Sequence, residues 1–302
     1  MIVRLALLAA AVVAFACPAL ARESLTVCLQ ANDPPLSMRD GEGFAVALSR
    51  TIAERLGREL RVQWFVSRDD PDASLAKDAD TLLSDGHCQL VAEYPLVADT
   101  LGRPYAPTAK LPPFDGAAPE DRRRWIKLGE LVATRPYRLD VLTIVLAAKA
   151  ANRPVRTLSD LDGLKVGVET ATLADAIAMR YAGGRLIEHV VHVPDARALF
   201  GRLQSGELDA AFVAQRELDA WRLRHGGDGL APTGYVHSIG FNMGFVGLAS
   251  EKQLIDDASG AIAALRASDA IIPLARAAGL TYVAPREPAV LPAVSPSALA
   301  GD

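Results

Sequence analysis

Cysteine and histidine are scarce in this 302-residue chain, which has three Cys and five His. Zinc and haem sites need such ligands at short, regular spacing, so we expect no metal and no cofactor. An excess of positive charge is also absent, because 36 Asp and Glu residues outnumber 32 Lys and Arg residues. Nucleic acids and anionic membranes attract clustered positive charge, so neither is expected as a partner.

A long hydrophobic run is missing too. The apolar run near the N-terminus covers only residues 5–16, whereas a helix that spans a bilayer needs about 20 apolar residues. Arg4 precedes this run and Ala19-Leu20-Ala21 follows it, which is the pattern of a cleavable secretory signal peptide. We expect removal of residues 1–21, export, and no membrane insertion of the remaining chain. Cys17 would permit a lipoprotein instead, although its neighbours fit that processing poorly.

Two cysteines, Cys28 and Cys88, remain after the signal peptide is removed. Paired thiols become disulfides in an oxidising compartment, so a Cys28–Cys88 disulfide is expected. The alternative is a pair of buried free thiols.

Neither low complexity nor an internal repeat is found before the C-terminal tail. The chain is 50% hydrophobic and 23% charged, as in ordinary globular proteins, which excludes collagen-like and disordered chains. Its length predicts about two compact units, each with its own core.

Short apolar runs alternate with amphipathic stretches from residue 25 onward. The first series predicts strands at 25–29, 60–65 and 88–93 and helices at 44–56 and 75–85, an order that implies parallel pairing. A second α/β series begins with a strand at 141–147 and includes a helix at 217–224, and a further apolar strand is predicted at 244–248. Residues 99–130 interrupt the rhythm and are predicted to be a surface insertion, and the Pro- and Ala-rich residues 285–302 are predicted to be a disordered tail.

Several short motifs occur in a familiar order: Leu25-Thr26-Val27-Cys28, Pro34-Pro35-Leu36-Ser37, Gly41-Glu42-Gly43-Phe44, Ser84-Asp85-Gly86-His87-Cys88, Thr134-Arg135-Pro136-Tyr137 and Leu164-Lys165-Val166-Gly167-Val168. Together they resemble bacterial solute-binding proteins of family 3, which are type 2 periplasmic binding proteins. Within that family, the placement of both cysteines and the Thr-Arg-Pro-Tyr motif most resemble the members associated with quinoprotein methanol dehydrogenases.

The resemblance implies an α/β protein of two lobes joined by two crossing hinge strands, located in the periplasm. Lobe 1 would comprise residues 24–135 and 244–284, and lobe 2 residues 141–241. Ligands bind outside the carboxyl ends of strands in such sheets, which places a ligand between the lobes.

Candidate ligand-binding residues are those that follow strand ends or adjoin the hinge: Asn32, Asp33, Glu93, Tyr94, Arg135, Thr170 and Thr172. The threonines precede a predicted helix, whose free N–H groups suit an anion. Each residue also has a local alternative. Thr170 or Thr172 could simply cap the helix, and Asn32 or Asp33 could stabilise the turn before Pro34.

The family comparison also reveals two departures. Amino-acid-binding members carry an Arg shortly after the third strand for the ligand carboxylate, where this chain has residues 98–101 without Arg. They also carry an acidic residue after the Asp-Ala strand, where this chain reaches Ala214. We therefore expect ordinary amino acids to bind poorly.

Three functions remain open. The first is an accessory of a quinoprotein dehydrogenase that acts by partner contact, small polar ligand binding, or both, with Trp125 in the insertion as a possible contact residue. The second is a conventional receptor that delivers a small polar or amino-acid-like solute to an ABC permease. A dehydratase on this fold is the third, but no carboxylate pair has a spacing that demands acid-base roles, so no catalytic residue is assigned and no enzyme is expected.

Overall fold

The computed structural model describes residues 23–67, 74–227 and 229–301, except for the side chain of Arg122. The predicted signal peptide lies outside these residues and remains a prediction. The strands are β1 (Ser24–Gln30), β2 (Glu59–Phe65), β3 (Leu90–Pro95), β4 (Thr108–Lys110), β5 (Trp125–Lys127), β6 (Leu131–Ala133), β7 (Arg138–Ala147), β8 (Val166–Glu169), β9 (Val190–Val193), β10 (Ala210–Ala214) and β11 (Leu230–Leu248). The helices are α1 (Phe44–Arg55), α2 (Leu75–Ser84), α3 (Leu173–Arg180), α4 (Ala196–Gln204), α5 (Gln215–His225), α6 (Lys252–Ala267) and α7 (Ile271–Ala277).

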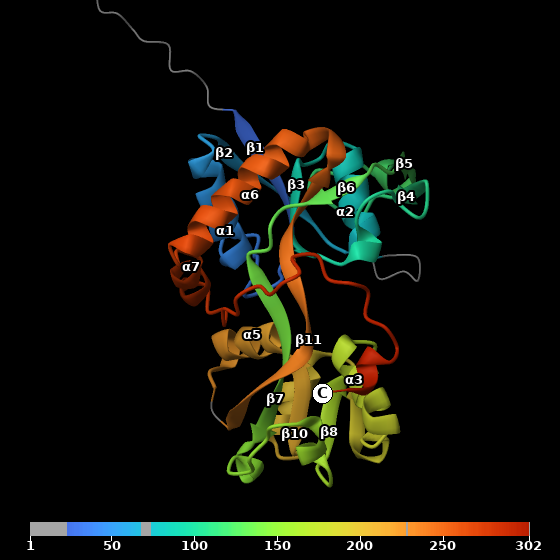
Figure 1. Ribbon diagram of the computed structural model, residues 1–302, viewed down its shortest axis with the longest axis vertical. Coiled ribbons are helices and arrows are strands. Elements are labelled where there is room, and N and C mark those ends of the chain that lie inside the picture. The colour runs from blue at the N-terminus through green and yellow to red at the C-terminus, as the bar shows by residue number, and fades with distance from the viewer. Residues whose placement is uncertain (1–22, 68–73, 228, 302) are drawn as a thin grey trace, which may run out of the picture.

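One curled sheet runs through the whole molecule in the order β2-β1-β3-β11-β7-β10-β8-β9, with β6 also paired to β11. Figure 1 shows two lobes, and the antiparallel pair β7 and β11 passes from one to the other. β1 pairs in parallel with β2 and β3 in lobe 1, while β8 pairs in parallel with β9 and β10 in lobe 2. The predicted two-lobed α/β fold with two crossing strands is confirmed.

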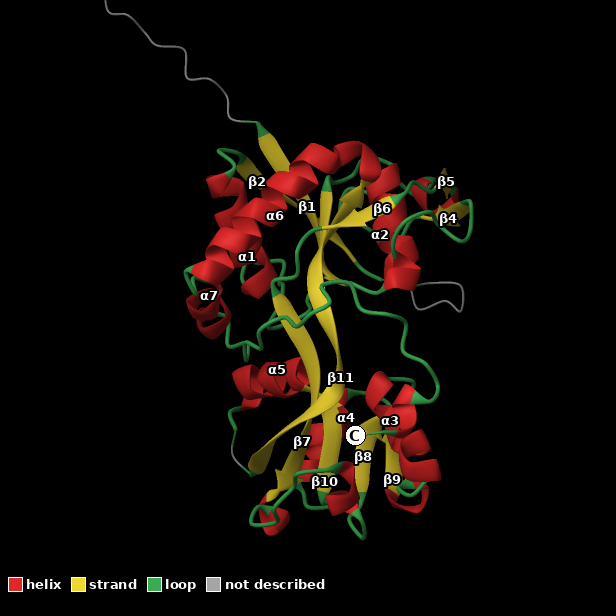
Figure 2. Cartoon of the chain, viewed as in Figure 1, coloured by secondary structure: helices red, strands yellow, loops and turns green. Residues whose placement is uncertain are grey.

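Helices cover both faces of the sheet in each lobe (Figure 2). In lobe 1, Leu25, Val27 and Leu29 of β1 pack in the cluster that includes residues of α1, α6 and α7, whereas Cys28 packs on the α2 side. The alternation follows from the two-residue period of a strand. β7 divides its side chains in the same way in lobe 2. Two buried faces explain why these strands are nearly continuous apolar runs.

The predicted disulfide is present. Cys28 and Cys88 are joined, with their Cα atoms 5.6 Å apart. Cys28 is on β1 and Cys88 precedes β3, the neighbouring strand, so the bond ties the α2 side of lobe 1 to the sheet.

The hinge depends on a close backbone approach. Gly240 of β11 lies opposite Val141 of β7, and a Cβ atom at Gly240 would lie 2.5 Å from the carbonyl oxygen of Asp140. The pairing of β11 with β7 also changes register on either side of Val236. A side chain at residue 240 would therefore separate the two crossing strands where the lobes meet.

The insertion at residues 99–130 contains the antiparallel ribbon of β4 and β5, which packs against α2. The side chain of Trp125 in β5 is exposed, and the side chain of Tyr105, shortly before β4, is fully exposed. Lys110 lies over the Trp125 ring, 5.3 Å from its centroid.

The structure differs from the prediction that residues 285–302 are disordered. Residues 285–301 lie against both lobes, and the backbone of Leu291 pairs with that of residues 96–98. Pro and Ala enrichment suggested disorder, but a chain without regular structure can still be held by hydrogen bonds to strand ends.

No single helix in the described ranges is long and apolar enough to cross a membrane. The bent pair Ala249–Ala267 and Ile271–Ala277 meets those two criteria together. Its apolar residues, including Leu254, Ile262 and Ile271, pack in the core of lobe 1.

Candidate functional site in the interlobe cleft

Two pockets of about 180 and 210 Å³ lie between the lobes. They share Asp140, Arg216 and Phe241 and therefore adjoin, and we call the two pockets together the cleft. Residues at and after the end of β1 and residues of β3 line its lobe 1 end, and residues at the starts of α3 and α5 line its lobe 2 end. The crossing strands β7 and β11 form the wall between the two ends.

Glu93 lies at the lobe 1 end of the cleft in an unusual backbone conformation, with φ of 56°. A non-glycine residue adopts this left-handed region only where its surroundings compensate for the strain. Here the backbone N–H of Glu93 donates a 2.7 Å hydrogen bond to the Tyr137 hydroxyl, which donates to Glu93 Oε1 at 3.1 Å. Tyr137 is fully buried and thereby fixes both the backbone and the carboxylate of Glu93.

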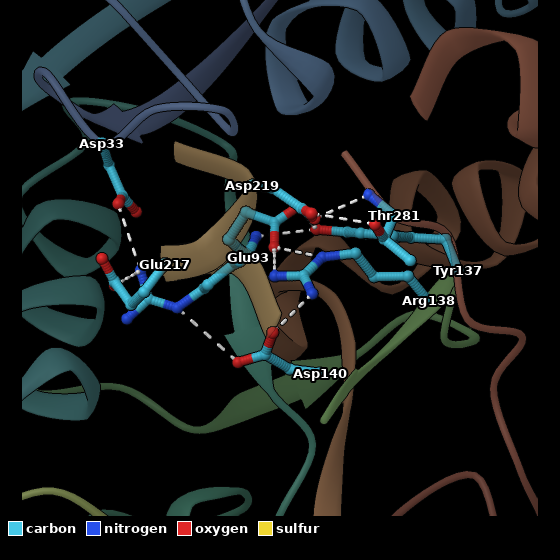
Figure 3. A network of polar contacts seen from close by, with 9 residues as sticks. Asp33, Glu93, Tyr137, Arg138, Asp140, Glu217, Asp219 and Thr281 are labelled. Carbon is cyan, nitrogen blue, oxygen red and sulfur yellow. Dashed lines mark hydrogen bonds and ion pairs between the residues drawn. The ribbon is translucent and has the colours of Figure 1, made fainter. Parts of the chain in front are cut away.

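Arg138 and Asp140 are two residues apart on β7, so both side chains lie on the same face of the strand. Arg138 Nε donates to Glu93 Oε2 at 2.8 Å, and its Nη1 donates to Asp140 Oδ1 at 2.9 Å. Its Nη2 also binds Glu93 Oε2. The side chain is only 3% exposed, and its nitrogen atoms already donate to two protein carboxylates (Figure 3).

Arg216 connects the two ends of the cleft. It lies in the first turn of α5, directly after β10, and its Nη1 is 2.9 Å from Glu217 Oε1 and 3.3 Å from Asp33 Oδ1 of lobe 1. Its Nε is 3.7 Å from Asp140 Oδ2. The contacts of Arg216 with Asp33 and Asp140 are longer than any contact of Arg138, and the Arg216 side chain is 32% exposed.

The cleft is acidic. Five carboxyl groups line it and only two guanidinium groups oppose them, both of which already contact carboxylates. The carboxyl groups belong to Asp33, Glu93, Asp140, Glu169 and Glu217, and the guanidinium groups to Arg138 and Arg216. With all seven ionised, the formal charge is five negative against two positive.

Burial dominates the titration of these groups. It raises the pKa of Glu93 and of Glu217, while the neighbouring Arg138 and Arg216 oppose the change. Burial also raises the pKa of Glu169, and the nearby Glu217 carboxylate raises it further. Burial works against the charge of Arg138, but the carboxylates of Glu93 and Asp140 outweigh it and raise its pKa, so Arg138 stays positive.

Three of the residues expected to bind ligand line the cleft: Asp33, Glu93 and Thr172. Thr172 is also the N-cap of α3, because its hydroxyl accepts from the N–H of Asp175 at 3.3 Å and donates to the Glu169 carbonyl at 2.7 Å. The structure therefore contains the helix cap that was the alternative to ligand binding by Thr172. Ligand binding by Asp33, Glu93 and Thr172 stays a prediction.

The other four candidates line neither pocket. Tyr94 points to the opposite face of β3 from Glu93, and its hydroxyl donates to the Thr100 carbonyl in lobe 1. This follows from strand alternation, which places neighbouring side chains on opposite faces. Arg135 precedes β7 and is exposed, with its N–H bonded to Ser259 Oγ on the outer side of lobe 1.

Asn32 and Thr170 are likewise exposed rather than part of the cleft. Asn32 adopts the left-handed backbone conformation, with φ of 58°, in the turn that follows β1. The Thr170 hydroxyl donates to the Val193 carbonyl at 3.0 Å, which ties the end of β8 to β9. Both residues act in local backbone geometry.

Sequence reasoning missed Arg138, Asp140, Arg216 and Glu217. Arg138 and Asp140 had a usable signal, since two charged residues spaced by two precede the apolar run of a crossing strand. The Asp-Ala strand ends at Ala214, which is not acidic. However, α5 begins immediately and its first turn supplies Glu217 to the cleft. No cluster of three or more His, Cys, Asp or Glu side chains suited to a metal ion is found among the described residues.

No family model and no curated protein matches the chain. Solved structures do match it. The unliganded, open L-cystine solute receptor of Neisseria gonorrhoeae aligns over 88% of this chain and 96% of its own, with a TM-score of 0.60 and 14% identity.

Two further structures give similar results. The open substrate-binding domain 2 of Lactococcus lactis GlnP aligns over 84% of this chain and 94% of its own, with a TM-score of 0.57 and 17% identity. A histidine kinase sensor domain similar to periplasmic binding proteins aligns over 88% and 99%, with a TM-score of 0.52 and 18% identity. At these identities the comparison establishes architecture: the chain has the two-lobed fold of type 2 periplasmic binding proteins.

Proposed function

We propose that this protein is an exported solute receptor whose cleft binds a small, positively charged solute and whose partner is an ABC permease. The observation that carries the proposal is the charge of the cleft, where five carboxyl groups face two guanidinium groups. A cation between the lobes would neutralise part of this excess, and the low dielectric of a closed cleft would strengthen the attraction. The matched solute receptors support the same class of function.

The same geometry disfavours a ligand that depends on a carboxylate anchor. A guanidinium group that binds a ligand carboxylate bidentately must be free of other carboxylate partners. Arg138 is already occupied by Glu93 and Asp140, and Arg216 is shared among Asp33, Asp140 and Glu217. Displacing Glu93 from Arg138 would leave a buried carboxylate without a partner, which costs several kcal/mol.

Calorimetry with a panel of amines, diamines, guanidines, quaternary ammonium compounds and the standard amino acids tests the proposal. We expect at least one cationic compound to bind, and we expect Glu217→Gln and Glu169→Gln each to weaken that binding about tenfold, which corresponds to roughly 1.4 kcal/mol. Glu188→Gln, at an exposed position of lobe 2, is the matched control and should bind normally.

Binding should also weaken on acidification. The carboxyl groups of Glu169 and Glu217 have raised pKa values, so they lose their negative charge at a higher pH than exposed carboxyl groups do. Tight binding of a standard neutral amino acid, with no response to either Gln variant, would contradict the proposal.

The second candidate is an accessory to a quinoprotein dehydrogenase that acts by contact. The observation in its favour is the exposed aromatic surface of the insertion, where Trp125 is 65% exposed and Tyr105 is fully exposed. Aromatic side chains are common anchors of protein interfaces. Binding of a purified quinoprotein dehydrogenase that is lost in Trp125→Ala, together with no binding from the solute panel, would favour this candidate over the solute receptor.

A further inference from the structure

The C-terminal segment crosses between the lobes more than once. After α7 in lobe 1, residues 281–301 pass α5 of lobe 2, follow the crossing strands, return to lobe 1 and end beside α3 in lobe 2 (Figure 1). We call residues 281–301 the C-terminal strap. Its contacts lie on lobe 2, on the crossing strands and on lobe 1.

The first anchor of the strap is on lobe 2. The Thr281 N–H donates to Asp219 Oδ2 at 2.7 Å, and its hydroxyl donates to Asp219 Oδ1 at 2.8 Å. Asp219 belongs to α5, is buried, and also accepts a 2.9 Å bond from Gln215. A buried carboxylate with three short bonds is a well-defined attachment point.

The second anchor is on the crossing strands themselves. Asn242 of β11 is fully buried, and its side-chain amide donates to the carbonyls of Arg286, Pro288 and Ala289 at 2.7, 3.1 and 3.0 Å. Its Oδ1 accepts from the Arg286 N–H at 3.1 Å. The amide of Asn242 is therefore devoted to the strap.

The Arg286 side chain extends this anchor along β11. Its Nη2 donates to the Gly240 carbonyl at 3.1 Å, and its Nη1 donates to the Ser238 carbonyl. The strap also accepts a 2.8 Å bond from the Leu139 N–H of β7 at the Val283 carbonyl. Both hinge strands are thus tied to the strap within the segment that must bend.

The last two anchors lie on opposite lobes. The Leu291 N–H donates to the Leu96 carbonyl at 2.8 Å, and the Leu291 carbonyl accepts from the Ala98 N–H at 2.9 Å, both in lobe 1. Leu299 then packs against the core of lobe 2, next to α3. Residues 291–299 therefore bridge the lobes by a path separate from β7 and β11.

We propose that the C-terminal strap restrains the angle between the lobes and so limits the hinge motion that opens and closes the cleft. A rotation about β7 and β11 changes the separation of the lobe 1 anchor at Leu291 from the lobe 2 anchor at Leu299. Seven residues, 292–298, join these two anchors, so their length sets an upper limit on how far the lobes can separate while both anchors stay in place. The restraint on the lobes does not depend on the proposed solute-binding function. Only its effect on solute binding rests on that function.

The experiment measures the interlobe distance without solute. Spin labels on Glu54→Cys in lobe 1 and Glu188→Cys in lobe 2, both exposed, give a distance distribution by pulsed electron resonance in a chain without residues 1–21. Cys28 and Cys88 are disulfide-bonded and stay unlabelled. The variants are Arg286→Ala, Leu299→Ala, and deletion of residues 285–302, with Arg276→Ala on the exposed side of α7 as the matched control.

We expect a single narrow distribution for the parent chain and for Arg276→Ala. We expect the deletion to broaden the distribution about twofold or to shift its mean, with smaller changes for Arg286→Ala and Leu299→Ala. Unchanged distributions in every variant that keeps its circular dichroism spectrum would overturn the proposal. The two single substitutions decide the question if the deletion does not fold.

Failure of the solute proposal would give a different pattern. A receptor without a cationic ligand would still show a distance that depends on the strap, because no solute is added. If a cation binds but the interlobe distance distribution is the same in all strap variants, the strap proposal is wrong and the solute proposal stands.

Discussion

Arg138 and Arg216 occupy the same cleft but are held very differently. Arg138 is 3% exposed and makes contacts of up to 2.9 Å with Glu93 and Asp140. Arg216 is 32% exposed, and its contacts outside its own helix are 3.3 and 3.7 Å. One guanidinium is fixed inside the hinge, whereas the other spans the gap between the lobes.

The difference separates a structural role from an adaptable one. A buried guanidinium that loses its partners, or carboxylates that lose the guanidinium, remain desolvated without compensation. A partly exposed ion pair exchanges protein contacts for water at little cost. We therefore expect Arg138 to stabilise the fold and Arg216 to be the group that rearranges when the cleft changes shape.

The largest effect is expected for Arg138→Ala. It would leave the Glu93 and Asp140 carboxylates without their shared guanidinium, and breaking a buried ion pair in this way costs about 3–5 kcal/mol. Urea unfolding followed by circular dichroism measures the loss. The control is Arg197→Ala, at an exposed position of α4. Equal unfolding midpoints for the two variants would show that the Arg138 ion pairs do not stabilise the protein.

Arg216→Ala should destabilise the protein less than Arg138→Ala, because the Arg216 ion pairs are only partly buried and the freed carboxylates can reach water more easily. A double-mutant cycle with Asp33→Asn, measured in the same urea experiment, sharpens the comparison by isolating the contact between the lobes. If Arg216→Ala lowered the free energy of unfolding as much as Arg138→Ala does, the two arginines would not differ in their contribution to stability.

The smallest effect is expected for Glu169→Gln. Because burial and Glu217 raise the pKa of Glu169 in the folded protein, ionised Glu169 destabilises the folded state relative to its protonated form. The penalty is absent below the unfolded pKa and appears as the pH rises through the folded pKa. The variant should melt slightly above the parent at pH 7, and the difference should shrink towards pH 4. If the difference in melting temperature grew as the pH fell, the pKa of Glu169 would be lowered in the folded protein instead of raised.

Much of the fold could be predicted from the sequence because its signals are local. Apolar residues at 44, 48 and 52 with a glycine stop predicted α1, and apolar runs predicted most strands of the sheet. The main miss was β11, expected only at 244–248 but extending from residue 230 to 248. Its first part alternates buried and exposed residues and contains Pro232 and two glycines, a pattern that does not resemble a strand.

The site was less predictable. Position at a strand end correctly suggested residues near the cleft, such as Asp33 and Glu93, but could not separate Glu93 from Tyr94, which point to opposite faces. Arg216 and Glu217 were missed because the start of α5 was expected at residue 217 instead of 215. An error of two residues at a helix start moves a side chain through half a turn of the helix.

The sequence by itself determined the α/β alternation, since periodicity records local burial. It also predicted the Cys28–Cys88 disulfide from the two cysteines that remain after the signal peptide, and its resemblance to solute-binding proteins implied the two lobes. Only the tertiary structure decided that five carboxyl groups from five separate segments meet in one cleft and that the C-terminal residues bind both lobes. These contacts join residues as far apart as Asp33 and Arg216, or Asn242 and Arg286. No local pattern encodes such contacts, because their geometry exists only after the lobes have formed and the crossing strands have set their separation.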